Sequence, residues 1–255
     1  MTLEKLTIPI IMLHHVADQP HSSLKKWCIS HNKFLELLDR IEQNGLVPTT
    51  FREIVELNLN EYELKDKVII SFDDCSAALF DFAIPELIKR KFKAVFYMPS
   101  AHIGDLNIWD IEEHAMESVS LMDKTQLQQL VILGMEVGSH GEKHLRLDSV
   151  SEQLAFNDIL NSKKTLEKLL DTKIYSFAFP YGKIPANHKK MLRKAGYEYG
   201  LSIYTAFETN YALRRFAINE KDDKETIDLK LGRKYRLMRL FYDPIFLLKN
   251  RLFKA

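Results

Sequence analysis

Two pairs of residues carry the side chains that metal-assisted hydrolysis needs. Asp73 and Asp74 end the segment SFDD, and His140 and His144 lie four residues apart in SHGEKH. Imidazole nitrogens and carboxylate oxygens bind catalytic zinc, which keeps one position open for water. Two adjacent carboxylates after an apolar strand are costly to bury unless they are paired or bind a metal, so one can hold an ion while the other faces the reacting water. The alternatives are a surface histidine pair and a helix cap made by Asp74 or Ser76.

Two further segments place polar groups directly after apolar runs. One ends in His14 and His15, and the other is FAFPYG, which ends in Pro180, Tyr181 and Gly182. The backbone N–H groups of such a turn can point toward a developing oxyanion, as acyl-transfer chemistry requires. The alternative for FAFPYG is an ordinary turn, since proline and glycine are common turn residues.

The elements that must position these groups alternate between strands and helices. The predicted strands are Ile8–His14, Lys67–Asp73, Lys93–Met98, Met135–His140, Ile174–Phe179, Tyr199–Ile203 and Ala212–Ile218. The predicted helices are His31–Asn44, Ala77–Arg90 with a kink or a true start at Pro85, Thr125–Leu133, Ser151–Leu170 and Ala186–Ala195. This alternation indicates an α/β protein of parallel βαβ units, and about seven units predict a distorted (β/α) barrel; a doubly wound open sheet is the alternative. The carboxyl ends of barrel strands open on one face, where active sites form, and the connection Ala101–Asp123 with Trp109 can lie over that face.

Composition narrows the class of protein. The chain has 255 residues, of which 46% are hydrophobic, enough for one large globular domain. Lys plus Arg is 36 against 35 for Asp plus Glu, and a formal charge of +1 gives no reason to expect a nucleic acid partner. Cys28 and Cys75 are too few for a disulfide framework, so reduced thiols are expected. The apolar run Ile8–Leu13 is shorter than a signal peptide needs, and no stretch reaches the ~18 apolar residues of a transmembrane helix, so a cytoplasmic location is expected.

The four polar segments, in this order and spacing, resemble the motifs of the polysaccharide deacetylase family, the NodB homology domain of carbohydrate esterase family four. SFDD is similar to the family's TFDD motif, and SHGEKH to its motif with two metal histidines four residues apart. FAFPYG and the N-terminal MLHH resemble the forms seen in exopolysaccharide deacetylases, whose catalytic histidine lies near the start of the chain. The resemblance covers residues 8–218 and implies a NodB-type barrel.

The resemblance also implies a role for each residue of these motifs. Three residues would hold a divalent metal, usually zinc: Asp74, His140 and His144. Asp73 would be the general base, the backbone N–H of Tyr181 would stabilise the oxyanion, and His14 would protonate the leaving amine, with His15 as the alternative acid. Three residues are assigned to contact with the substrate: Pro180, His15 and Trp109.

Four positions depart from the family's pattern. Ser71 replaces threonine, and Gly141 stands where a Ser or Thr hydroxyl usually follows the first metal histidine. No arginine precedes FAFPYG to orient the general base, and LRRFAI at residues 213–218 stands where most members have an L-x-H-D segment with the general-acid histidine. The last two absences, together with His14, favour the exopolysaccharide-type branch.

The predicted function is metal-dependent removal of N-acetyl groups from an acetamido sugar. The sugar would belong to a polysaccharide of capsule, lipopolysaccharide or exopolysaccharide synthesis, or to its lipid-linked precursor. One alternative is a deformylase or small-amide hydrolase on the same scaffold. The other is a non-catalytic carbohydrate-binding module, which the missing arginine and Gly141 allow, and against which the intact aspartate and histidine pairs argue.

The predicted catalytic domain covers residues 1–220, and a basic amphipathic extension covers residues 221–255. Its basic residues are Lys230, Arg233, Lys234, Arg236 and Arg239, and its apolar residues at helical spacing are Tyr235, Met238, Tyr242, Ile245, Leu248 and Leu252. Pro244 is expected to interrupt any single helix. The segment either meets anionic membrane lipid or a lipid-linked sugar as a peripheral membrane contact, or packs on the barrel with a solvated basic face.

Overall fold

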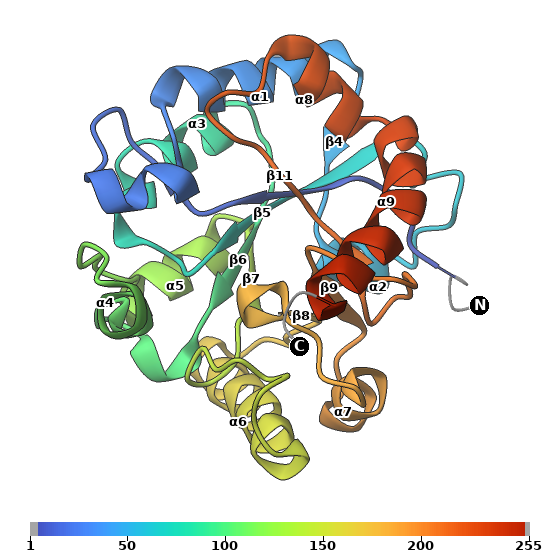
Figure 1. Ribbon diagram of the computed structural model, residues 1–255. Helices are drawn as coiled ribbons and strands as arrows, with labels where there is room; N and C mark the ends of the chain where they lie inside the picture. Colours follow the sequence, from blue (N-terminus) through green and yellow to red (C-terminus); the bar gives the residue numbers. More distant parts are fainter. Residues whose placement is uncertain (1–4, 253–255) are drawn as a thin grey trace.

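The computed structural model describes residues 5–252 and shows a parallel sheet surrounded by helices (Figure 1). One sheet contains nine strands: β1 (Ile10–Leu13), β4 (Val47–Pro48), β5 (Lys67–Asp73), β6 (Val95–Met98), β7 (Glu136–Ser139), β8 (Ser176–Ala178), β9 (Tyr199–Ser202), β10 (Leu213–Arg214) and β11 (Phe216–Ala217). Their order is β10-β9-β8-β7-β6-β5-β1-β11, with β4 paired to β5. A second, two-stranded parallel sheet joins β2 (His15–Val16) and β3 (Cys28–Ile29).

The sheet closes into a barrel through one stretch of chain that changes partner halfway. β10 pairs in parallel with β9 at one edge, β11 pairs in parallel with β1 at the other, and only Arg215 separates β10 from β11. The predicted strand Ala212–Ile218 is therefore two short strands, because its two halves bond to opposite edges of the sheet. The prediction of a distorted parallel (β/α) barrel is confirmed.

Helices form the outer layer of the barrel (Figure 1). The α-helices of the described residues are α1 (His31–Gln43), α2 (Phe51–Glu56), α3 (Ala83–Lys89), α4 (Ile108–His114), α5 (Lys124–Ile132), α6 (Glu152–Leu170), α7 (His188–Ala195), α8 (Lys224–Leu231) and α9 (Arg233–Leu252). Short 3-10 helices occupy four connections: η1 (Ser22–Trp27), η2 (Ala77–Phe80), η3 (Ser100–His102) and η4 (Pro180–Gly182).

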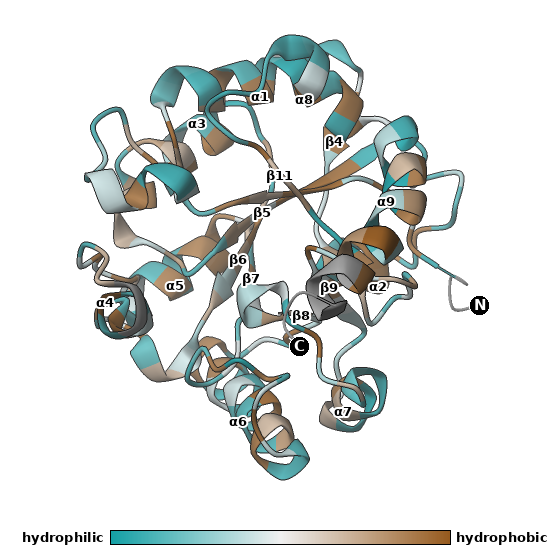
Figure 2. Ribbon diagram, in the orientation of Figure 1, coloured by the Kyte–Doolittle hydropathy of each residue, from teal (hydrophilic) through white to brown (hydrophobic). Residues whose placement is uncertain are grey.

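The core lies between the strands and the helices, and it follows from the apolar patterns of both. α1 begins after Ser30, whose hydroxyl accepts a hydrogen bond from Lys33 N at 3.1 Å, as an N-cap does. Its apolar stripe is completely buried against the sheet: Phe34, Leu37, Leu38 and Ile41. β5 is buried on both faces from Val68 to Asp73, which explains its unbroken apolar run. Figure 2 shows brown along the strands and mixed brown and teal on the outer helices.

Three regions of the chain differ from the predicted secondary structure. Pro85 lies in the first turn of α3, so the predicted helix Ala77–Arg90 is a 3-10 turn followed by a separate helix. The connection Ala101–Asp123 contains α4, which carries Trp109. The expectation that Pro244 interrupts the last helix is wrong, because α9 continues through it. A proline removes one backbone hydrogen bond without having to end a helix that other contacts hold in place.

Two absences expected from the sequence can be compared with the structure. Cys28 and Cys75 are both buried and neither forms a disulfide. Within residues 5–252, no helix has the combination of length and apolar character that crossing a bilayer requires.

Candidate active site

The three predicted metal ligands meet at the carboxyl end of the barrel. Asp74 directly follows β5, His140 directly follows β7, and His144 lies on the loop after it. Asp74 Oδ1 is 3.5 Å from His140 Nε2 and 3.4 Å from His144 Nε2. One ligand atom from each of the three residues lies within 4.8 Å of the other two, and all three side chains are buried. The cluster therefore has the size and the donor atoms of a site for one cation.

The histidine rings are held so that their Nε2 atoms face Asp74. His140 Nδ1 lies 2.7 Å from the carbonyl oxygen of Ala178 at the end of β8. A carbonyl only accepts hydrogen bonds, so the proton lies on Nδ1 and Nε2 keeps its lone pair. The His144 ring packs between Trp109, at a centroid distance of 4.3 Å, and Tyr181, at 4.7 Å. Burial lowers the pKa of both histidines, which favours the neutral form that binds metal.

The backbone is strained at three of the predicted site residues. Asp74, His144 and Tyr181 have φ angles of +67°, +54° and +57°. This left-handed conformation costs a non-glycine residue on the order of 1–3 kcal/mol, and it persists where the surrounding structure imposes it. Such strain is concentrated at functional sites, and here it occurs at two of the three clustered residues and at Tyr181, whose ring packs against His144.

Asp158 of α6 fixes the loop between the two histidines. Its carboxylate accepts hydrogen bonds from the backbone N–H groups of Glu142 and Lys143, each at 2.9 Å. A Cβ at Gly141 would approach Asp158 Oδ2 to 2.5 Å, and Gly141 has a φ of +82°. This contact explains why glycine follows His140 where the family usually has Ser or Thr. Burial raises the pKa of Asp158 to about 6.

The second aspartate, Asp73, is held by an arginine that the sequence analysis did not assign. Arg215 Nη1 lies 2.5 Å from Asp73 Oδ1, and Arg215 Nη2 lies 2.7 Å from Asp73 Oδ2. Burial alone would raise the pKa of Asp73, but Arg215 and His140 hold it below its ordinary value. Asp73 is therefore ionised and held in one orientation. The arginine missing before FAFPYG is supplied from LRRFAI, where a charged residue inside a short apolar strand was the available signal.

The charges of the site are unbalanced without a cation. Asp73 is neutralised by Arg215, whereas Asp74 Oδ1 is buried and has no hydrogen-bond partner among the described residues. Burial and the neighbouring charge of Asp73 raise the pKa of Asp74 well above its ordinary value. A cation at this position would remove the penalty, since an opposite charge favours the ionised carboxylate. The orphaned oxygen between two Nε2 atoms thus fits a divalent metal. The alternative helix cap is not made, because neither Asp74 nor Ser76 caps η2 with its side chain.

The N-terminal histidines lie on the other side of Asp73. His14 Nε2 is 4.0 Å from Asp73 Oδ2, and its ring centroid is 4.9 Å from that of Trp27. Burial lowers the pKa of His14 to about 3, although the charge of Asp73 acts in the opposite direction. Burial also lowers the pKa of His15 to about 4. Both imidazoles are therefore neutral in the resting protein at neutral pH.

All predicted site residues except Pro180 line one cavity of about 310 Å³. Pro180 is buried at the start of η4 and does not line this cavity, so its contact with the substrate stays a prediction. The buried indole Nε1 of Trp109 has no hydrogen-bond partner within residues 5–252. Several further residues that line the cavity were not predicted from the sequence, among them Lys26, Trp27, Lys183 and Ile203. These residues lie in connections without a motif, so no sequence pattern marked them.

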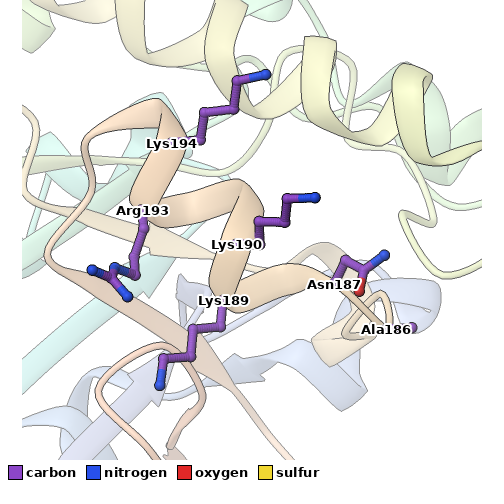
Figure 3. Close-up of a pocket in the computed structure, with 6 residues that line it drawn as sticks. All are labelled: Ala186, Asn187, Lys189, Lys190, Arg193 and Lys194. Carbon is purple, nitrogen blue, oxygen red and sulfur yellow. The ribbon is translucent and has the colours of Figure 1, made fainter.

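A second hollow on the surface has a different character. It lies over α7 and is lined by Ala186, Asn187, Lys189, Lys190, Arg193 and Lys194 (Figure 3). The basic side chains extend from one exposed helix, and no carboxylate, histidine or cysteine lines it. It therefore offers none of the groups that hydrolysis needs, and the chemistry belongs to the cavity around Asp74.

Comparison with known proteins connects this site to a family. The family profile described as polysaccharide deacetylase matches residues 61–200. The poly-beta-1,6-N-acetyl-D-glucosamine N-deacetylase of Staphylococcus epidermidis is 28% identical over 231 residues, which span 84% of this chain and 71% of that protein. The protein of the same name from Staphylococcus aureus strain MRSA252 is 24% identical over 207 residues, which span 77% of this chain and 70% of that protein.

Solved structures show the same fold. The deacetylase PplD of Streptococcus pyogenes, in complex with acetate, has a TM-score of 0.74 at 19% identity, over 89% of this chain and 99% of that one. IcaB from Ammonifex degensii has a TM-score of 0.69 at 21% identity, over 88% of this chain and 98% of that one. This likeness agrees with the predicted NodB-type deacetylase barrel.

Proposed function

Because the chain belongs to the polysaccharide deacetylase family, we propose that it is a metal-dependent hydrolase that removes N-acetyl groups from an acetamido sugar polymer. The observation that carries the proposal is the buried cluster of Asp74, His140 and His144 beside a second carboxylate paired with arginine. The Staphylococcus relatives are named for poly-beta-1,6-N-acetyl-D-glucosamine, and we propose this polymer, or a close relative of it, as the substrate. The lipid-linked precursor predicted from the sequence is the second candidate substrate.

We propose zinc as the metal, held by Asp74 Oδ1 and the Nε2 atoms of His140 and His144. When bound, a divalent cation polarises the acetyl carbonyl and lowers the pKa of a water molecule toward ~7. The protein supplies the neutral imidazoles, because the carbonyl of Ala178 keeps the proton of His140 on Nδ1. It also supplies a second carboxylate, that of Asp73, which is not one of the proposed metal ligands.

The remaining steps are assigned to the protein's own groups. Asp73, kept ionised by Arg215, takes the proton of the attacking water. The backbone N–H of Tyr181 donates to the oxyanion of the tetrahedral intermediate. His14, which is neutral at rest, receives a proton within the reaction and passes it to the leaving sugar nitrogen. Asp73 Oδ2 at 4.0 Å is the neighbour from which the proton comes.

The aromatic walls of the cavity are the proposed contacts for the sugar. Trp109 places its unpartnered Nε1–H in a buried position, where it can donate to a polar group of the substrate. Trp27 is about one-third exposed beside His14, so its ring can stack on a neighbouring sugar. His15 lines the same wall and remains the alternative general acid.

The test combines metal analysis with acetate release by the purified full chain. The wild type should retain about one divalent metal per chain and should release acetate from poly-beta-1,6-N-acetyl-D-glucosamine oligomers. His144→Ala should lose both properties, while the control Asp148→Ala, at an exposed aspartate near the same loop, should keep both. Full metal content with normal turnover in His144→Ala would remove the metal assignment. A wild type that binds metal and releases no acetate from any acetylated sugar would favour the carbohydrate-binding alternative.

A second test separates the general acid from the metal site. His14→Ala should lower turnover by about 10²–10⁴-fold, the range typical of a lost general acid, while the metal content stays unchanged. His15→Ala serves as the matched control at the neighbouring imidazole, with a smaller expected effect. If His15→Ala causes the larger loss, the two histidines exchange roles, and unchanged turnover in both variants excludes them from proton transfer.

A further inference from the structure

The last helix turns its charged side inward. Arg239 Nη2 donates to the carbonyl oxygen of Ile203 at 2.7 Å, and Arg236 Nη2 donates to that of Leu6 at 2.6 Å. Asp243, the only acidic residue of α9, is 1% exposed and accepts from Arg214 Nε at 2.8 Å. The middle of α9 is therefore attached to the barrel by its polar residues, opposite to the usual arrangement of an amphipathic helix.

This orientation corrects the expected basic surface. Lys230, Arg236 and Arg239 were placed on it by the sequence, but each of them bonds inward, Lys230 to the carbonyl oxygen of Ala217 at 2.8 Å. Arg233 and Lys234 alone of the five basic residues are exposed, and neither makes an ion pair within the described part of the chain. The reason is that the periodicity of a sequence separates two faces without showing which one meets the barrel.

The side of α9 that faces away from the barrel is apolar. Its exposed residues, which we call the outer face of α9, are Leu237, Met238, Leu240, Phe241, Tyr242, Ile245, Phe246 and Leu248. Phe241 is 74% exposed, while the apolar stripe of α1 is completely buried. The loop after β9 extends this surface, because Tyr204 stacks on Phe246 at a centroid distance of 4.5 Å, and Phe207 of the same loop is 85% exposed. Contiguous apolar surface of this kind marks an interaction site.

We propose that the outer face of α9 docks on the surface of an anionic lipid bilayer. The charges around it suit such a partner, since the exposed cations Arg233 and Lys234 precede the face and the single acid of the helix is buried. Phe241, Tyr242 and Phe246 provide the aromatic rings that partition to the boundary between lipid headgroups and acyl chains. No acidic side chain lies on the face to oppose anionic headgroups.

Docking in this way would bring the active site to the membrane surface. Ile203 lines the catalytic cavity, and its carbonyl oxygen is the group that Arg239 of α9 bonds. Figure 1 shows α9 slanting from α8 toward β9, and Tyr204, two residues after β9, stacks on Phe246 of α9. The inference goes beyond the proposed hydrolysis, and it explains how a polymer or lipid-linked sugar held at a membrane would meet the cavity.

The experiment measures vesicle binding by the full chain without any substrate. Vesicles of phosphatidylcholine mixed with phosphatidylglycerol are compared with vesicles of phosphatidylcholine alone in a flotation assay. The test variant Phe241→Ser/Ile245→Ser removes two exposed side chains of the outer face. The matched control Tyr62→Ser/Ile132→Ser makes the same kind of change at exposed residues elsewhere, 85% and 84% exposed. Acetate release from a soluble oligomer should be the same in all three proteins, since none of these residues lines the cavity.

The wild type and the control should float with the anionic vesicles, and the test variant should bind them at least about tenfold more weakly, as expected for the loss of two large apolar contacts. Arg233→Glu/Lys234→Glu should weaken binding to the anionic vesicles alone. Equal binding by test variant and control would overturn the proposal, as would no binding by the wild type. Sedimentation velocity without lipid tests the alternative that a second copy of the chain binds the outer face. A wild type that is a dimer, together with a test variant that is a monomer, would assign the face to that second copy. Because no substrate is present, each of these results leaves the deacetylase proposal intact.

Discussion

Arg214 and Arg215 are adjacent in the chain, yet they belong to two ion networks on opposite sides of the barrel wall. The outer network joins the barrel to α9 and consists of Lys5, Arg214, Arg236, Arg239, Glu208 and Asp243. The inner network belongs to the active site and consists of Arg215, Asp73 and Asp74, with His140 between the two acids. Successive residues of a strand point to opposite faces, so a single stretch of five residues supports both networks.

The two networks differ in their balance of charge. The outer one has three arginines and Lys5 for two acids, and every carboxylate oxygen in it accepts a hydrogen bond. The inner one has one arginine for two acids, and Asp74 Oδ1 accepts none from residues 5–252. A buried network in which every carboxylate oxygen has a partner is a structural attachment, whereas a network that leaves an acid without a positive partner is prepared to bind a cation. The partners of the buried acids thus distinguish a structural network from a functional one, although both contain the same types of residue.

The largest expected effect on acetate release comes from neutralising Asp74, the acid without a positive partner. Asp74→Asn should lower acetate release by more than about 10³-fold, because a metal ligand is lost. The free energy of unfolding of the metal-free protein should stay the same or increase, since the substitution removes a buried charge without a partner. Acetate release and urea unfolding after chelator treatment measure the two effects. A clear loss of stability in metal-free Asp74→Asn would show that Asp74 has a protein partner and would end the contrast.

In the outer network we expect the reverse, a loss of stability with little change in acetate release. Arg214→Met should lower the free energy of unfolding by about 3–5 kcal/mol, because it leaves Glu208 and Asp243 buried with fewer partners. Acetate release per folded molecule should stay close to that of the wild type at a temperature where the variant is folded. The control Arg40→Met breaks the more exposed pair with Asp228 and should cost much less, because solvent screens an exposed ion pair. Equal losses in the two variants would mean that the outer network adds nothing beyond a surface ion pair.

The sequence predicted the parts of the inner site that lie next to a motif. The strand Lys67–Asp73 has the bounds predicted for it, and α1 differs from its prediction only at the last residue, because apolar runs and caps are local signals. Asp74, His140 and His144 converge as expected, since the carboxyl ends of parallel strands share one face of the barrel.

The rest depends on contacts between distant residues. Arg215 reaches Asp73 across a separation of 142 residues, and only the change of partner between β10 and β11 turns it inward while Arg214 turns outward. Asp158 is a polar residue within the amphipathic pattern of α6, and its hydrogen bonds to the histidine loop leave no trace in that pattern. The inverted packing of α9 follows from partners such as Arg214 that lie on another element.

A smaller effect on turnover is expected when Arg215 is replaced by a residue that keeps the positive charge but cannot make two parallel hydrogen bonds. Arg215→Lys offers one point charge in place of two parallel hydrogen bonds to Asp73. The pKa of Asp73, now held below its ordinary value, should rise toward it, and turnover should fall by about tenfold as the base loses its fixed orientation. Because the base must be ionised, the acidic limb of the pH profile of kcat/KM should move to higher pH while the metal content stays unchanged. An unmoved acidic limb would show that Arg215 does not control the charge of Asp73.

The smallest effect on acetate release is expected at Glu136, a third kind of buried acid. It lies at the start of β7, accepts hydrogen bonds from Arg52 N at 2.7 Å and from the Ser176 hydroxyl at 3.2 Å, and makes no ion pair within the described residues. Burial raises its pKa from 4.5 to about 7, so this acid, which has no cation beside it, keeps its proton up to about pH 7.

The sign of the resulting pH dependence follows from the raised pKa. Between pH 4.5 and about 7 the unfolded chain has released the proton that the folded chain still holds, so Glu136 contributes stability below this window and loses it as the pH rises through the window. Glu136→Gln does not titrate, so the Tm of the wild type relative to the variant should fall by several °C across the window, because a rise of the pKa from 4.5 to about 7 corresponds to about 3 kcal/mol. Thermal unfolding of both metal-free proteins from pH 5 to pH 8 measures the difference. A Tm difference independent of pH would mean that a cation balances Glu136 after all, and the distinction between acids that bind a metal and acids that keep a proton would then rest on Asp74 alone.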